Sequence, residues 1–329
     1  MAGFNHRTRK MTLATLGVGL ACIAIHVTRA AAAPQGIDEV RARAEAGDAE
    51  AQNRLGELYM FGEGLEHDKQ AALLWFRKSA KQGNADAMCN LAVAYYNGSG
   101  VSTSDILSLA WFLAAQKAGC ERASEAVQRA ESQLRPWDVL RAYDFVAEMY
   151  QKGEELPKDD AEAVQWWQKA ALRGDADAQV SLAVIFLNGK GVPQDLVQGR
   201  HWCDELEKKH DSRGSYCLGY IRQHGLGGDL DAAAARKLYA KAALDHYPPA
   251  MKALAGMEAK GEGGKVDRIS ASLLYARLAA RGDQESLQSL AEIKAQMSPK
   301  DWKKVESQLH FSQVDPQKLN ADLAQVKFP

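Results

Sequence analysis

The sequence lacks an excess of charge of either sign, and it contains no long run of like charges. Its 41 Lys and Arg residues are balanced by 42 Asp and Glu residues, so the formal net charge at pH 7 is −1. Proteins that bind nucleic acids normally carry a basic patch or stripe. The composition therefore argues against a nucleic-acid partner.

The sequence also lacks the short motifs by which common catalytic and metal sites are recognised. Its Gly-x-Gly pairs lie between predicted helices rather than after a strand, which is not the context of a phosphate-binding loop. No Ser, His and Asp residues form a local signature of a nucleophilic triad. Residue types that zinc accepts occur at His201, Cys203, His210, Cys217 and His224. Their spacing fits no zinc ribbon or finger, because His201 and Cys203 face different directions on a helix. We expect no cofactor, no metal ion and no catalytic residues.

The first 33 residues have the pattern of a targeting segment. A basic start at residues 6–10 is followed by mostly apolar residues 11–27 and by small residues at 30–33 that suit cleavage. We interpret residues 1–33 as a signal peptide and expect a periplasmic or secreted protein with no other membrane association. The alternative is an uncleaved membrane anchor, although the apolar stretch is slightly short for a span of about 20 residues.

Cysteine is scarce, and four of the five cysteines lie beyond the targeting segment, at Cys89, Cys120, Cys203 and Cys217. Disulfides are permitted in an exported protein, and four cysteines allow three complete pairings. Cys203 and Cys217 are nearest in sequence and would lie on successive helices, which makes them a candidate disulfide. The alternative is that all four are small, buried, apolar residues.

What the sequence does contain is a repeat. Six glycines lie 36 residues apart, except for one step of 55: Gly62, Gly98, Gly153, Gly189, Gly225 and Gly261. A second column with the same spacing holds Trp75, Trp111, Trp166, Trp202, Leu238 and Leu274. A repeat of this length is typical of helical pairs that bury their apolar faces against their neighbours. We assign the tryptophans of this column to the core rather than to a sugar-binding surface.

Each repeat carries its own signals for helix ends. In the first copy, Ala51, Leu55 and Leu58 share one face of a helix, which Gly62 can end in the left-handed conformation. Asp68 can then cap the next helix. The glycine that closes the second helix is replaced in two copies by His210 and His246. These could form a pH-sensitive pair, or they could simply mark the loss of a glycine stop.

The repeated pattern resembles the Sel-1-like repeat, a relative of the tetratricopeptide repeat, over residues 45–283. Two copies carry it most fully: Ala87-x3-Leu91-Ala92-x2-Tyr95-x2-Gly98-x-Gly100-Val101 and Ala178-x3-Leu182-Ala183-x2-Phe186-x2-Gly189-x-Gly191-Val192. Copies five and six depart most, with Gly228 and Gly264 in place of the valine, and Glu155 replaces the second glycine of copy three. The resemblance implies an all-α fold, an α/α solenoid wound as a right-handed superhelix of about six helix-turn-helix repeats.

The 55-residue step predicts an extra helix inside the array. Copies one and two match copies five and six at an offset of 163, and the match continues into the segments that follow each pair. We expect the chain to divide into repeats one and two (38–120), an inserted helix (121–137), repeats three to six (138–283) and a C-terminal helical cap (284–329). Our hypothesis is that the inserted helix interrupts the regular stacking and either bends the array or separates copies one and two from copies three to six.

The first helices of such repeats often line a concave groove, and the positions opposite their core face are the candidate partner-binding residues. In copies four and five these positions are mostly apolar, which favours a binding patch. The candidates are Asn53, Glu57, Asp144, Glu148, Val180, Val184, Leu187, Tyr216, Tyr220 and Gln223. The alternative is that neighbouring helices or the chain ends bury this face.

We therefore predict an exported adaptor or scaffold that binds a protein or peptide and is not an enzyme, as the resemblance also implies. Two alternatives stay open. A secreted or periplasmic hydrolase of the cysteine-rich repeat type would be favoured by a reactive, unpaired cysteine beside a histidine. An envelope glycan-binding module would be favoured by aromatic rings exposed in the groove.

Overall fold

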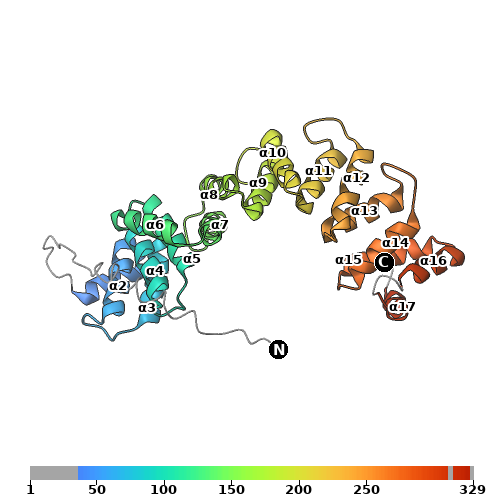
Figure 1. Cartoon of the computed structure of the whole chain (residues 1–329). Helices are drawn as coiled ribbons and strands as arrows, with labels where there is room; N and C mark the ends of the chain where they lie inside the picture. The colour runs from blue at the N-terminus through green and yellow to red at the C-terminus, as the bar shows by residue number, and fades with distance from the viewer. Residues whose placement is uncertain (1–35, 310–313, 327–329) are drawn as a thin grey trace, which may run out of the picture.

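The protein is a curved array of helices (Figure 1). The computed structural model describes residues 36–309 and 314–326, and within these ranges it contains seventeen α-helices and no strand. The helices are α1 Ile37–Glu45, α2 Ala49–Phe61, α3 Lys69–Ala80, α4 Ala85–Asn97, α5 Asp105–Lys117, α6 Glu121–Gln133, α7 Pro136–Lys152, α8 Asp160–Leu172, α9 Ala176–Asn188, α10 Leu196–Lys208, α11 Ser212–His224, α12 Ala232–Leu244, α13 Pro248–Lys260, α14 Arg268–Ala279, α15 Gln284–Ala295, α16 Pro299–Leu309 and α17 Pro316–Gln325.

Six helical pairs make up the repeats: α2 with α3, α4 with α5, α7 with α8, α9 with α10, α11 with α12, and α13 with α14. Each pair packs against the next, and Figure 1 shows the chain running from α2 at one end of the arch to α17 at the other. The predicted all-α solenoid is confirmed.

Glycine and short polar side chains set the helix ends, as the sequence predicts. The first helix of every repeat stops at a glycine whose φ lies between 62° and 75°, where a residue with a Cβ atom would be strained. The second helix of every repeat starts at Asp or Ser, whose side chain accepts a hydrogen bond from a backbone N–H of the first turn, as Asp68 does from Gln70 and Ala71.

Two histidines adopt the backbone conformation of the glycines they replace. His210 and His246 both have a φ of 58°, and they are the only non-glycine residues with a positive φ in the part of the chain that the structure describes. The helix stop is therefore kept although the glycine is lost, at the expense of local strain. Glu155, by contrast, stays out of this conformation, so the loop of copy three differs from the others.

One apolar core runs without a break from Ala72 on α3 to Ile221 on α11. The extra helix α6 does not interrupt it, because α6 packs beside α5 while α7 also packs directly against α5. The nearly buried carboxylate of Glu162 on α8 pairs with Lys117 on α5 at 2.9 Å across this junction. The inserted helix therefore does not separate two blocks of repeats, and a bend of the array at this helix stays a prediction.

The core divides instead near the start of α12. Beyond Ile221, one small cluster centres on Tyr239 and Leu254, and another continues from Ala255 into α17. We call α3–α11 the N-terminal array and α12–α17 the C-terminal array. In the tryptophan column, Trp111, Trp166 and Trp202 are buried as predicted, whereas Trp75 of copy one and the two leucines of the C-terminal array are only half-buried. The smaller side chains bury less apolar area between repeats.

The predicted signal peptide, and its alternative of an uncleaved anchor, lie outside the described residues. Among the helices of the described ranges, none combines the length and the apolar character needed to cross a membrane.

Candidate functional site

A cavity of about 320 Å³ opens on the array where the continuous core ends. Helices α9 and α11 form its two walls, α10 contributes Leu206, and Tyr247 closes it from the start of α13. We call this cavity the groove, and its lining residues are Val180, Ala183, Val184, Leu187, Asn188, Leu206, Arg213, Tyr216, Cys217, Tyr220 and Tyr247. The structure thus brings together five of the ten predicted partner-binding residues, which are Val180, Val184, Leu187, Tyr216 and Tyr220.

Helical spacing explains why one wall is aliphatic and the other aromatic. Val180, Val184 and Leu187 are four and three residues apart on α9, and Tyr216 and Tyr220 are four apart on α11, so each set shares a helix face. Val184 is 49% exposed, so about half of this apolar side chain faces solvent at the wall of the cavity. The groove is therefore an apolar surface that the described chain leaves open.

The tyrosines of the groove form one aromatic cluster. The ring of Tyr216 lies 5.6 Å from that of Tyr239 in a tilted arrangement and 5.4 Å from that of Tyr247 in an edge-to-face arrangement. Burial raises the pKa of both Tyr216 and Tyr247 above the usual value for tyrosine, so both rings stay neutral well above neutral pH. The cluster fixes the aromatic wall against the core of the C-terminal array.

Arg213 lies at the edge of the groove, but its positive charge is largely neutralised by neighbouring carboxylates. Its guanidinium donates hydrogen bonds to both carboxylate oxygens of Asp211 and, at 2.6 Å, to Asp177 on α9. These bonds lower the pKa of Asp211, mainly through the hydrogen bond from Arg213. Two carboxylates thus neutralise the guanidinium and tie the first turn of α11 to that of α9.

A disulfide lies in the wall of the groove. Cys217 of the lining is bonded to Cys203 on α10, and Cys89 on α4 is bonded to Cys120 at the start of α6. All four cysteines of the described residues are therefore paired.

The disulfide between Cys203 and Cys217 makes these two residues unavailable as zinc ligands. Among the described residues, no group of three or more His, Cys, Asp or Glu side chains is arranged to hold a metal ion.

The other five predicted residues do not line the groove. Asn53 and Glu57 lie on α2, near the opposite end of the array, where the buried Asn53 amide donates to Glu57 at 3.2 Å and accepts from Asn90 at 2.9 Å. Asp144 and Glu148 lie on α7, one repeat before the aliphatic wall. Gln223 lies at the end of α11 and accepts a hydrogen bond from Tyr239.

Residues that the sequence did not single out complete the lining. Tyr247 and Arg213 lie outside the positions opposite the core face, because Tyr247 caps α13 and Arg213 lies in the first turn of α11. Only the Tyr-Pro-Pro start of α13 could have drawn attention to Tyr247, since a proline is common at the first position of a helix and places the preceding residue at its cap.

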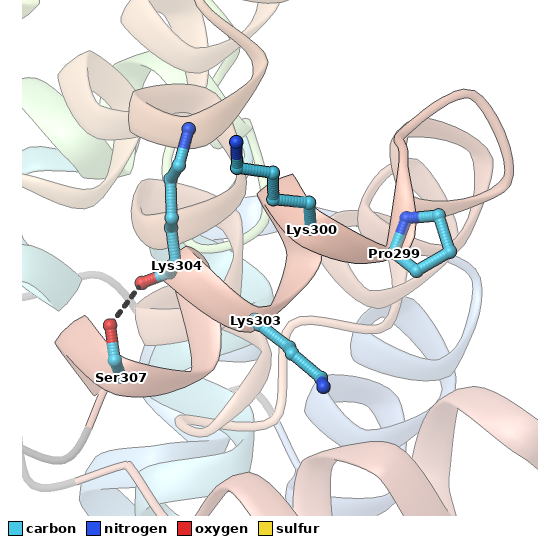
Figure 2. A pocket seen from close by; sticks show the side chains of 5 residues that line it. All are labelled: Pro299, Lys300, Lys303, Lys304 and Ser307. Carbon is cyan, nitrogen blue, oxygen red and sulfur yellow. Dashed lines mark hydrogen bonds between the residues drawn. The ribbon is translucent and has the colours of Figure 1, made fainter.

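A second cavity, of about 490 Å³, lies over the outer face of α16 and is lined by Pro299, Lys300, Lys303, Lys304 and Ser307. Figure 2 shows that Lys303 points away from Lys300 and Lys304, and that the Ser307 hydroxyl bonds to the backbone oxygen of Lys304. Lys304 is already paired with Asp301 at 2.8 Å. Because all five residues belong to one helix and do not converge, we regard this cavity as a surface depression.

Comparisons with known proteins agree with the repeat pattern. The family model described as Sel1 repeat matches residues 49–84, 85–120, 140–175, 176–205, 214–246 and 248–283. No curated protein matches the chain.

Three solved structures are similar to the chain. One is c5321, described as a protective antigen present in uropathogenic Escherichia coli strains and displaying an SLR fold, with 28% identity and a TM-score of 0.48. The match covers 88% of this chain and 63% of that one, so this chain spans less than two thirds of its length. A Sel1 repeat protein from Oxalobacter formigenes is 27% identical over 78% of this chain and 80% of the other, with a TM-score of 0.42. A putative Sel1 repeat protein from Klebsiella pneumoniae subsp. pneumoniae is 20% identical over 68% of this chain and 99% of the other, with a TM-score of 0.27.

Proposed function

Because the chain belongs to the Sel1 repeat family, whose members generally act as protein-interaction scaffolds, we propose that it is an exported, non-catalytic adaptor that binds a protein or peptide partner in the groove. The observation that carries this proposal is the open apolar cavity between α9 and α11. Repeat arrays present extended binding surfaces of this kind. A cavity with an aliphatic wall and an aromatic wall suits the apolar side chain of a partner, since burial of that side chain drives association.

The tyrosine wall favours a second candidate, an envelope glycan-binding module, but the rest of the lining supports it less. Sugars bind where an aromatic face is presented together with several hydrogen-bonding groups. In the groove Tyr216 packs against Tyr239 and Tyr247, and the facing wall is aliphatic. The peptide partner therefore accounts for more of the surface.

Two features support a non-catalytic role and export. An unpaired cysteine beside a histidine would favour the hydrolase alternative, whereas the four cysteines of the described residues form two disulfides. Disulfides persist in oxidising compartments such as the periplasm, which supports a periplasmic or secreted location. Thiol titration of the folded, mature protein tests both points, because a reactive thiol among these four would revive the hydrolase alternative.

The groove is tested by selecting peptides from a displayed random library on the mature protein and measuring their affinity by fluorescence polarisation. Val184→Asp places a charge in the open part of the aliphatic wall, and we expect affinity to fall at least about tenfold because a carboxylate would be desolvated beside the ligand. Val197→Asp is the matched control, since Val197 is 78% exposed on α10 and does not line the groove.

Equal affinity of the wild type and the Val184→Asp variant would refute the groove as the binding site. Selective binding on a glycan array that Val184→Asp abolishes, without binding of any peptide, would replace the peptide function with the glycan function.

A further inference from the structure

The helix wall that precedes the groove is acidic. Asp144 and Glu148 on α7 occupy the repeat positions that Val180 and Val184 occupy on α9, 36 residues later. Glu148 is 40% exposed, and Asp144 is partly exposed. The surface therefore changes from carboxylates on α7 to aliphatic side chains on α9 and tyrosines on α11.

Asp144 is held in a setting that disfavours its charge. The Trp167 indole donates a hydrogen bond to its carboxylate at 2.8 Å. Burial nevertheless raises the pKa of Asp144, and the negative charges of Glu148, Asp175 and Asp177 raise it further. A neutral asparagine would accept the same hydrogen bond without this repulsion. The carboxylate is thus not explained by the stability of the fold, and a cation brought by a ligand would relieve the repulsion.

The basic side chains of this surface do not fully neutralise Asp144 and Glu148, so a cation from a ligand can pair with them. Lys152 pairs with Glu148 at 2.5 Å, but Lys152 is 54% exposed, and a pair this exposed is weak and readily exchanged. Arg213, on the other side of the aliphatic wall, is occupied by Asp177 and Asp211. Of the charged groups near the groove, the α7 carboxylates are therefore the ones whose charge is least neutralised by other side chains.

We propose that the groove takes an extended peptide whose bulky apolar side chain fills the cavity between Val184 and Tyr220, and whose Lys or Arg side chain pairs with Asp144 and Glu148. This inference rests on the proposed function and specifies its ligand. Helices α7 and α9 both pack against α8, and packed helices lie about 8–10 Å apart, so α7 and α9 are separated by about 10–20 Å. An extended chain advances about 3.3 Å per residue, so the basic residue lies about three to six positions from the apolar one.

The test uses fluorescein-labelled peptides of Gly, Ser and Ala that carry one Trp and one Arg, with the full mature protein as receptor. Arg is placed one, three or six positions from Trp, on either side, and Gln replaces it in matched peptides. We expect an Arg peptide with the three- or six-residue spacing, in one of the two directions, to bind about five- to tenfold more tightly than its Gln counterpart, and we expect the one-residue spacing to give no such advantage. This advantage should shrink as salt screens the pair.

Asp144→Asn separates a ligand-binding role from a structural one. The variant keeps the hydrogen bond from Trp167 and loses the charge, so we expect it to unfold at the same or a higher temperature while the preference for Arg over Gln falls to about twofold or less. Glu125→Gln is the control, because Glu125 is 76% exposed on α6, away from the groove, and its removal should leave the preference unchanged.

The outcomes distinguish this inference from the function on which it rests. If Trp peptides bind through Val184 with the same affinity whether they carry Arg, Gln or Glu, the charge pairing is overturned and the groove stands. If no peptide binds, or binding ignores Val184→Asp, both fail. If glycans bind in place of peptides, both are again overturned.

Discussion

The N-terminal and C-terminal arrays are built from the same repeat, yet only the first has a continuous core. The N-terminal array fills its tryptophan column with indole rings and anchors its interhelical loops with apolar side chains such as the fully buried Leu156. In the C-terminal array the column holds Leu238 and Leu274, and Gly228 and Gly264 occupy the loop position. The comparison teaches that the apolar core of a solenoid can divide while its repeats keep the same helical pairs.

The groove lies at the boundary between the two arrays. Of its aliphatic wall, Leu187 belongs to the continuous core, whereas Tyr216 packs with Tyr239 and Tyr247 beyond that core. Both disulfides of the described residues lie before this boundary or on its last helix. The binding surface is therefore supported on one side by the better packed array and on the other by the less packed one.

The largest expected effect comes from removing a ring of the tryptophan column. Trp111 is 1% exposed, so Trp111→Ala should reduce the free energy of unfolding by about 3–5 kcal/mol through lost burial and a cavity. Leu274→Ala, in the same column of the C-terminal array, should cost about 1–2 kcal/mol because Leu274 is only half-buried. Urea unfolding followed by circular dichroism measures both. Equal costs would contradict the assigned difference between the arrays.

Reduction of the disulfides should weaken the N-terminal array selectively. The pairs Cys89–Cys120 and Cys203–Cys217 are separated by 31 and 14 residues, and each cross-link should contribute about 3–4 kcal/mol by restricting the unfolded chain. Hydrogen exchange with and without a phosphine reductant should show faster exchange in α4 and α10 and little change in α14. A variant with all four cysteines replaced by serine serves as the control and should not respond to the reductant.

Restoring glycine at the two strained helix stops should stabilise each array once, since His210 follows α10 in the N-terminal array and His246 follows α12 in the C-terminal array. His210→Gly and His246→Gly relieve a left-handed conformation but loosen the unfolded chain, so together they should add about 1 kcal/mol. Thermal unfolding measures the gain. Gly174→Ala, at the equivalent position with a φ of 93°, should cost a similar amount and provides the reverse test. A loss of stability on His→Gly substitution would show that the imidazoles make contacts worth more than the strain.

The smallest expected effect concerns the loops of the C-terminal array. Gly228 is outside the left-handed region, and a Cβ atom built on it meets no atom within 4 Å. Gly228→Ala should therefore stabilise the protein by about 0.5 kcal/mol, because the unfolded chain loses freedom. Its neighbour Gly227 has a φ of 69°, so Gly227→Ala should destabilise it. Midpoints of urea unfolding compare the two, and the same sign for both would contradict the loop conformation.

Local signals made much of the fold predictable. Glycines such as Gly62 and capping residues such as Asp68 act within a few residues of themselves, so their spacing located the helices. The placement of α6 was not predictable in the same way, because whether it enters the stack depends on whether α7 reaches α5. Likewise, the division of the core depends on how deeply Leu238 and Leu274 are buried, and the residue types at this repeat position do not determine that burial.

The candidate site was predictable only in its regular part. Val180, Val184, Tyr216 and Tyr220 occupy fixed positions of the repeat, and the structure places them around one cavity. Tyr247 and Arg213 lie at helix starts, where the fold of neighbouring repeats decides whether a side chain turns toward the cavity. Asn53 and Glu57 occupy the same repeat positions as the groove residues but lie on α2, far from the groove. A repeat position determines which face of the array a residue lies on, and it does not determine how far along the array the residue lies.

Because α6 packs beside α5 rather than between α5 and α7, the chain next to α6 is a suitable site for an inserted domain. Since α5 and α7 pack directly on each other, residues added in the turn between α6 and α7 should leave the stack of repeats undisturbed. A second domain inserted in that turn would lie beside the array. The groove between α9 and α11 is several helices away and would stay accessible.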